Sequence, residues 1–239
     1  MYRVAIVAAL EREVKPLVKT WRVKEEEHSG KSFRFFEQDP AVLVCGGIGA
    51  QAARRAAEAV IANYAPAIIY SVGFCGALDP QLNVGDVIQP AQVIDANDGS
   101  RVSMGEGKGI LVSFASVASP AQKAKLKESY SAVVVDMEAA AVARAAQARG
   151  IEFAVVKAIS DEFDFVFPSM EQFVDSAGVF HHGRFAAFAA VRPWLWPKVG
   201  RLATNSDRAS RALCTWLATS LNRMISGAPD RQPEATHRS

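Results

Sequence analysis

The sequence predicts a single α/β domain in which helices flank a sheet of buried strands. The clearest support is a strand–helix–strand pattern at residues 133–164, where two apolar, β-branched runs enclose an Ala-rich segment without proline. Further short apolar runs recur between residues 2 and 114. The chain has 239 residues, of which 50% are hydrophobic, and this is enough for one sizeable core.

The expected elements alternate along the chain. Strands are expected at 2–9, 33–37, 41–45, 67–72, 83–88, 109–114, 133–135 and 153–159. Helices are expected from Glu11 to Leu17 and over 50–63, 120–129 and 137–149. Ser119 and Pro120 form a typical helix start, and Gly150 a typical stop. Residues 95–109 are polar and glycine-rich, which favours a flexible surface loop. The GxGxG within them neither follows a strand nor opens a helix, so it is not a dinucleotide-binding motif.

Composition and residue spacing argue against nucleic-acid binding, metal binding, secretion and a membrane-spanning helix. The formal net charge of +2 gives no indication of a nucleic-acid partner. The three cysteines, Cys45, Cys75 and Cys214, are widely spaced, and the four histidines form no ligand pattern, so we expect no metal site and a reducing cytoplasm. The first residues lack the features of a signal peptide, and no uncharged run approaches the ~20 residues that span a bilayer.

Carboxylates gather at the predicted carboxyl ends of strands. Asp136 and Glu138 follow the strand at 133–135, Asp161 follows Ser160 at the end of the next strand, and Glu13 lies just after the first strand. Ligands of parallel α/β sheets bind outside these strand ends, so we expect a shared crevice. The alternative is that Asp136 and Asp161 only cap helices, and spacing alone slightly favours it.

Two other stretches could contact a ligand. The loop Gly46-Gly47-Ile48-Gly49 opens a helix, where it can cradle an anion or a hydroxyl-rich ligand or simply form a tight turn. The segment 161–168 contains three phenylalanines, Phe163, Phe165 and Phe167. These rings could stack on a flat ligand, but packing is their commoner role.

The composition changes after Gly183. Residues 184–225 contain seven basic residues against the single acid Asp207, together with three tryptophans. An apolar helical face is formed by Leu213, Trp216, Leu217, Leu221 and Met224. This segment could lie on an anionic membrane or pack on the sheet with a solvated basic face. We therefore expect a main domain at 1–183, a helical extension at 184–226 and a disordered tail at 227–239.

Five motifs resemble the nucleoside phosphorylase superfamily, in the order AIVAALEREV, GGIGAQAA, GFCGALDPQLNVGDVI, VVVDMEAAAVA and VVKAISDEFD. The similarity covers roughly residues 2–180 and is greatest to the methylthioadenosine/S-adenosylhomocysteine nucleosidases. A short middle region and the basic extension resemble the hopanoid-associated branch, proposed to act on adenosylhopane. The resemblance implies a central mixed, partly barrel-like sheet flanked by helices, no cofactor, and a homodimer or larger homo-oligomer. It also implies cleavage of the N-glycosidic bond of a purine nucleoside.

The resemblance also assigns roles to single residues. Asp161 matches the acid that protonates the purine N7, and Glu13 matches the carboxylate that activates water. Glu138 matches the residue that binds the ribose hydroxyls, and Met137 the one that packs on the sugar. Lys157 stands where the nucleosidases commonly carry arginine. Expected substrate contacts are completed by Gly76, Ser160 and Phe163.

These residue types suit the reaction. A purine anion is a poor leaving group, so an acid that is still protonated near neutral pH lowers the barrier. The sugar develops oxocarbenium character, and a fixed carboxylate strengthens hydrogen bonds to its hydroxyls.

The sequence leaves open whether water or phosphate is the nucleophile, and whether the protein is an enzyme or only binds its ligand. Phe74 replaces a small hydroxyl residue of the phosphorylases, which favours water over phosphate, whereas Arg12 and Gly49 could still contact phosphate. A nucleoside- or lipid-binding protein that has lost catalysis is an alternative of another class. The expected location is the cytoplasm or, through residues 184–225, the membrane periphery.

Overall fold

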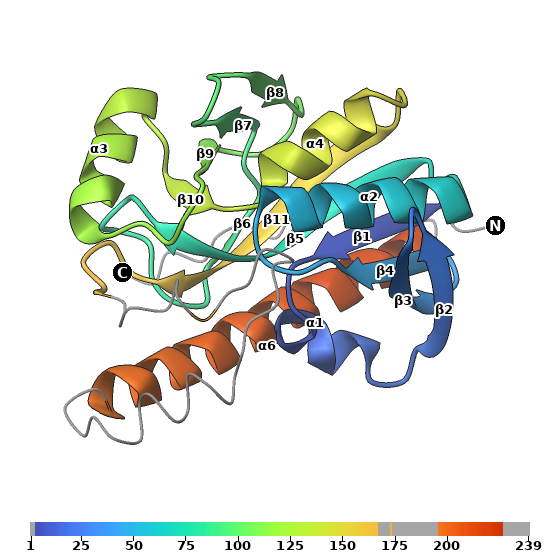
Figure 1. Cartoon of the computed structure of the whole chain (residues 1–239). Helices are drawn as coiled ribbons and strands as arrows, with labels where there is room; N and C mark the ends of the chain where they lie inside the picture. Colours follow the sequence, from blue (N-terminus) through green and yellow to red (C-terminus); the bar gives the residue numbers. More distant parts are fainter. Residues whose placement is uncertain (1–2, 167–172, 174–195, 227–239) are drawn as a thin grey trace.

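The computed structural model describes residues 3–166, 173 and 196–226, which form a mixed sheet with helices on both faces (Figure 1). The strands are β1 Val4–Ala8, β2 Arg22–His28, β3 Lys31–Gln38, β4 Ala41–Cys45, β5 Ile68–Ala77, β6 Val87–Ile88, β7 Gln92–Asp95, β8 Arg101–Ser103, β9 Ile110–Ser113, β10 Val134–Asp136 and β11 Glu152–Asp161. The helices are α1 Glu11–Val18, α2 Ala50–Tyr64, α3 Pro120–Tyr130, α4 Ala139–Gln147 and α6 Trp196–Ser226. No described helix combines the length and apolarity needed to cross a bilayer.

The sheet has 11 strands in the order β2-β3-β4-β1-β5-β10-β9-β7-β8, while β11 pairs with β5 and β6. β1 is parallel to β4 and β5, and β11 is parallel to β5. The hairpins β2–β3 and β3–β4 are antiparallel. The predicted α/β domain with a mixed sheet is therefore confirmed.

The long strand β5 changes partners along one edge. β1 pairs with its first half, from Ile68 to Ser71, and β10 pairs antiparallel with its last residues, Gly76 and Ala77. Neither β1 nor β10 pairs with residues 72–75 in between. β11 runs along β5 from Ile68 to Gly76. This change of partners leaves a gap between the ends of β1 and β10, and it positions the site described below.

Alternation of side chains produces a core on each face of the sheet. In β1, Ala5 and Val7 pack in the cluster that includes α2 and α4, whereas Val4 and Ile6 pack in the cluster that includes α1 and α6. A third, smaller cluster joins α3 to β9 and β10 through Leu126, among others. Each of the three hydrophobic clusters therefore packs helices against strands of the sheet.

Several details differ from the sequence predictions. The strand expected at 83–88 is formed only by Val87–Ile88, and β7 had not been predicted. The strand expected at 67–72 continues to Ala77, because β11 and β10 pair with its glycine-containing end. The loop expected at 95–109 contains β8, which pairs with β7. The charged strand β2 had not been predicted, because an exposed edge strand shows no apolar alternation.

The C-terminal helix α6 packs its apolar face on the sheet. Leu213, Leu217 and Leu221 are buried in the cluster with α1, β1 and β11, and Trp216 packs against its edge. Met224, which was expected on the same face, is 44% exposed. Of the two alternatives for this segment, packing therefore describes residues 196–226, and residues 184–195 lie outside the described part.

We expect Leu213→Ala to lower the free energy of unfolding by about 2–5 kcal/mol, because the fully buried side chain leaves a cavity between α6 and the sheet. Urea titration followed by circular dichroism measures the loss. The exposed Met224→Ala on the same helix is the control and should cost less than about 1 kcal/mol. Equal losses in the two variants would contradict this packing.

Candidate active site

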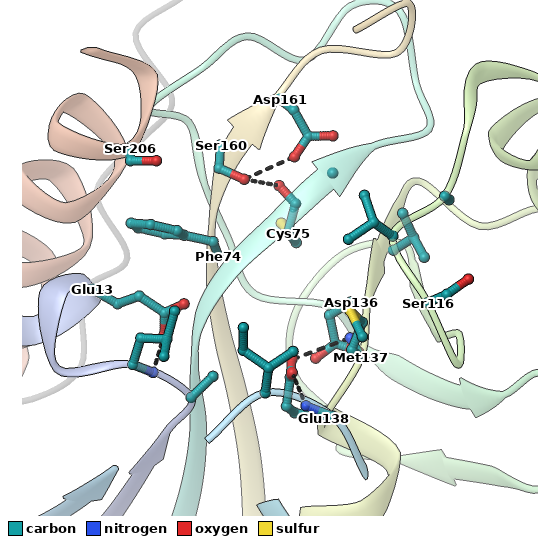
Figure 2. Close-up of a pocket in the computed structure, with 18 of the residues that line it drawn as sticks. Glu13, Phe74, Cys75, Ser116, Asp136, Met137, Glu138, Ser160, Asp161 and Ser206 are labelled. Carbon is teal, nitrogen blue, oxygen red and sulfur yellow. Dashed lines mark hydrogen bonds between the residues drawn. The ribbon is translucent and has the colours of Figure 1, made fainter. Parts of the chain in front are cut away.

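A cavity of about 430 Å³ opens at the gap in the edge of β5 (Figure 2). Its walls come from the residues after β1, the start of α1, the end of β5, the loop before α3, the β10–α4 junction, the end of β11 and one face of α6. Polar groups in the wall are contributed by Arg12, Glu13, Ser116, Lys123, Asp136, Glu138, Ser160, Asp161 and Ser206. Residues far apart in the chain thus meet in one crevice, as expected for carboxyl strand ends.

Asp161 is the last residue of β11 and is buried beside a lysine. Its Oδ2 lies 2.5 Å from the Nζ of Lys123, and its Oδ1 accepts a 2.8 Å hydrogen bond from Ser160 Oγ. Gly76 makes room for this pair, since a Cβ there would lie 2.7 Å from Asp161 Oδ2 and 3.2 Å from Lys123 Nζ. The carboxyl is desolvated as predicted, but the neighbouring ammonium was not predicted.

Glu13 faces the cavity from the first turn of α1. Its Oε2 accepts a 3.3 Å hydrogen bond from the backbone of Leu10, and its side chain packs over Gly73, where a Cβ would lie 2.7 Å from Oε2. Burial raises the pKa of Glu13, and the charge of Lys157 opposes this shift. A carboxylate of raised pKa is a stronger base, which suits removal of a proton from water.

Glu138 lies at the junction of β10 and α4, and its carboxylate occupies the N-terminus of α2. Oε1 accepts a 2.8 Å hydrogen bond from the backbone of Gly49, and Oε2 accepts one of 3.2 Å from Met137. Burial, followed by repulsion from Asp136, raises the pKa of Glu138 to about 7. The predicted glycine loop therefore does hold an anion, but the anion belongs to the chain itself.

Asp136, in the cavity wall, forms a buried ion pair with Lys157, which is not part of the wall. Lys157 Nζ lies 2.8 Å from Asp136 Oδ2, and the side chain of Lys157 is only 1% exposed. Asp136 also accepts hydrogen bonds from Ser113 Oγ and from the backbone of Ala139 at the start of α4. Helix capping, the simpler alternative, thus applies to Asp136 but not to Asp161.

Most of the predicted substrate contacts line the cavity, and two do not. Met137, Gly76 and Ser160 lie in its wall, as do the two predicted phosphate contacts Arg12 and Gly49. The prediction for Lys157 needs correction, because it lies below the wall and neutralises Asp136.

Phe163 is half-buried but is not part of the wall, so the geometry does not support its stacking on a ligand. Phe165 is buried in packing, with the guanidinium of Arg201 5.5 Å from its ring centre. Phe167 lies outside the described residues.

Several wall residues escaped the sequence reasoning, and Lys123, Leu202 and Ser206 are the most informative of them. Lys123 is one of three lysines in α3, and only the fold distinguishes it from exposed Lys125 and Lys127. Leu202 and Ser206 come from α6, more than 40 residues after Asp161. No local pattern in the sequence marks any of them.

The arrangement provides acid–base chemistry without metal ligands. Within the described part of the chain, no group of three or more His, Cys, Asp or Glu side chains could hold a metal ion. Besides Asp136, which is paired with Lys157, the cavity brings together three carboxyl groups in different surroundings. Asp161 lies beside an ammonium, Glu13 lies near Lys157, and Glu138 lies on a helix N-terminus. Carboxyl groups separated in this way can serve as acid, base and hydrogen-bond acceptor.

Comparisons with known proteins agree with this architecture. A 5'-methylthioadenosine/S-adenosylhomocysteine nucleosidase of Marinomonas sp. (strain MWYL1) is 26% identical over 197 residues, covering 66% of this chain and 85% of the relative. The futalosine hydrolase of Helicobacter pylori superposes with a TM-score of 0.69 at 15% identity, covering 93% of this chain and 98% of that one. A Neisseria meningitidis 5'-methylthioadenosine/S-adenosylhomocysteine nucleosidase in complex with methylthio-immucillin-A gives 0.69 at 19% identity, with 94% and 100% covered.

The match to a family extends over most of the chain. Two overlapping segments, residues 3–128 and 109–182, match the Phosphorylase superfamily and include every strand of the sheet and four of the five described helices. The chain therefore belongs to the Phosphorylase superfamily.

Proposed function

We propose that this protein is a purine nucleosidase that uses water to cleave the N-glycosidic bond of an adenosine-type nucleoside. The observation that carries the proposal is the convergence of Asp161, Glu13 and Glu138 on one cavity. The nucleosidase names of the relatives support the same reaction and substrate class.

Asp161 acts as the acid toward the base. As the bond between C1′ and N9 breaks, its electron pair moves into the purine, and a proton from Asp161 to N7 makes the departing base neutral. Ser160 donates to Oδ1 and Lys123 holds Oδ2, so the carboxyl group has a fixed orientation. A carboxyl group held in one orientation needs no reorganisation when charge develops on the base.

Glu138 and Glu13 act on the sugar side. Glu138 accepts hydrogen bonds from ribose hydroxyls, and these bonds strengthen as the sugar becomes cationic. Glu13 takes a proton from the water that attacks C1′. Met137, in the cavity wall beside Glu138, packs on the sugar.

Water fits this site better than phosphate. The backbone N–H of Gly49 is already occupied by Glu138, and a phosphate would lie near two carboxylates that repel it. Arg12 in the cavity wall supports the second candidate, a phosphorylase. Chromatography of the sugar product with and without phosphate separates the two, because hydrolysis yields the free sugar and phosphorolysis its 1-phosphate.

The finer assignments of substrate, assembly and location remain predictions. A panel of methylthioadenosine, adenosylhomocysteine, inosine and an adenosyl lipid, scored for free base, tests the adenosine-type class and the adenosylhopane hypothesis.

A homodimer or larger oligomer is tested by sedimentation. Contact of residues 184–225 with an anionic membrane is tested by liposome co-sedimentation, and Arg201 and Arg211 are already paired with Glu162 and Asp207.

We expect Asp161→Asn to slow release of the base strongly while the protein stays folded, because an amide cannot give a proton to N7. Base release from methylthioadenosine should fall by about 10²–10⁴-fold, the usual contribution of a general acid. Reverse-phase chromatography measures the rate, and thermal melting checks the fold. A folded variant that releases adenine at the wild-type rate would exclude Asp161 as the acid.

We expect Gly76→Ala to displace the acid. Its Cβ would lie 2.7 Å from Asp161 Oδ2, so the carboxyl must move, and a misplacement of this size can cost about 10²-fold in rate. Steady-state kinetics measures kcat. Gly200→Ala on α6 is the matched control, because its Cβ would meet nothing within 4 Å, and it should leave kcat unchanged. Similar rates in both variants would contradict the tight placement.

We expect kcat/KM to fall as the pH is lowered through about 7, because Glu138 then takes up a proton and loses its charge. Glu138→Gln should be much less active, and its remaining activity should lack this acidic decline.

The stability of the protein should show the opposite trend. Because the folded-state pKa of Glu138 lies above its ordinary value of 4.5, the stability that it contributes is fully present below 4.5 and is lost as the pH rises through about 7. Melting curves of wild type and Glu138→Gln across this range measure that difference. A difference that stays constant with pH would contradict the assignment.

A further inference from the structure

The acid of the site shares its cavity wall with a buried lysine. Lys123 Nζ donates to Asp161 Oδ2 at 2.5 Å and to the backbone oxygen of Glu162 at 2.6 Å. The side chains of Lys123 and Asp161 are 1% and 6% exposed, and both line the cavity. An ammonium in such a place loses its hydration, which costs several kcal/mol unless a partner compensates.

Lys123 does more than fasten α3 to the sheet. Apolar packing of Leu126 in the cluster with β9 and β10 already holds this helix. Lys125 and Lys127 extend from the same helix into solvent, whereas Lys123 points inward at the one carboxyl that faces the departing base in the proposed reaction. Gly76 is also needed to admit the lysine, since a Cβ there would lie 3.2 Å from both Cε and Nζ.

The ionisable groups near the Lys123–Asp161 pair are themselves neutral or paired. On β5, the thiol of Cys75 is neutral, because burial raises its pKa well above the ordinary value. Asp136 on β10 is neutralised by Lys157 of β11. The carboxylate of Glu162 is neutralised by Arg201 of α6, and on α3 Lys127 lies 3.7 Å from Asp79. Glu13 and Glu138 lie in the opposite part of the wall (Figure 2).

We propose that Lys123 is a positioning residue for the acid. By holding its ammonium against Asp161, it keeps a transferable proton beside the departing base. This inference rests on the proposed nucleosidase function. The ammonium–carboxylate pair and the amine–carboxylic acid pair hold the same number of protons. When a purine covers the pair and removes water, the neutral arrangement becomes more favourable, because desolvation penalises both charges.

The proton then moves in a balanced sequence. Lys123 Nζ gives a proton to Asp161, and Asp161 gives one to N7 while the bond between C1′ and N9 breaks and its electron pair enters the base. The oxygen of water bonds to C1′ as Glu13 takes the water's proton. After release of the base, Glu13 loses that proton to solvent and Lys123 regains one, so that nucleoside and water become free base and free sugar.

The test compares kcat–pH profiles of wild type and Lys123→Met for release of adenine from methylthioadenosine. At about pH 8 the variant should be slower by about 10²-fold, because no ammonium then holds a proton beside Asp161. At about pH 5 the two should agree within about tenfold. KM should change little, because Lys123 acts through Asp161. Lys125→Met, an exposed lysine on the same helix, should follow the wild-type profile.

Each outcome of this comparison either supports or overturns the proposed role of Lys123. A deficit of equal size at every pH would mean that Lys123 has only a structural role, and a wild-type profile would mean that it has none. If Lys123→Met does not fold, Lys123→Gln replaces it, since its amide can still donate hydrogen bonds without a charge, and the same alkaline loss is expected. Failure of the wild-type protein to release base from any nucleoside would overturn the proposed function and this inference together. Activity with an unaltered variant profile overturns this inference alone.

Discussion

Burial of several ionisable groups around one short gap in the sheet is the constraint on which the rest of this structure depends. A charge removed from water costs several kcal/mol unless partners replace its hydration. Lys123 compensates Asp161, Lys157 compensates Asp136, and the N-terminus of α2 compensates Glu138. These partners come from three different helices or strands, so the site requires the whole sheet to be assembled.

Glycines in β5 make this crowding of charges feasible. Gly73 adopts φ +138° and lies under the carboxylate of Glu13, and Gly76 lies under Asp161 and Lys123. Glycine normally weakens the interior of a strand, but here β11 and β10 pair with the same segment and keep it extended. The glycines of β5 thus leave space for the side chains of the site, and hydrogen bonding to β10 and β11 stabilises the strand there.

Prediction from the sequence succeeded where a local pattern determined the structure. The apolar runs and the Ala-rich helix placed Glu138 and Asp161 at strand ends, and the fold brought them together. It failed where only tertiary packing decides. Lys123 and Lys125 lie two residues apart in one lysine-rich stretch, and no local pattern distinguishes them. Alternation alone could not orient Lys157, which pairs with Asp136 of the cavity wall. The charged strand β2 forms because β3 pairs with it, not because its residues favour burial.

The last helix shows most clearly that the site belongs to the whole chain. α6 lies beyond the residues that match the family, yet Leu202 and Ser206 form part of the cavity wall. It also contacts the two segments that carry the proposed base and the proposed acid. The hydroxyl of Ser210 donates a 3.0 Å hydrogen bond to the backbone oxygen of Glu13, and Arg201 pairs with Glu162, next to Asp161.

The sequence predicted this helix as an extension after residue 183 that either packs on the sheet or lies on a membrane. Its contacts link the proposed base on α1 to the segment after the proposed acid on β11, which are about 150 residues apart in the chain. Because acid and base must face the same bond from fixed positions, the orientation of α6 is part of the geometry that catalysis requires.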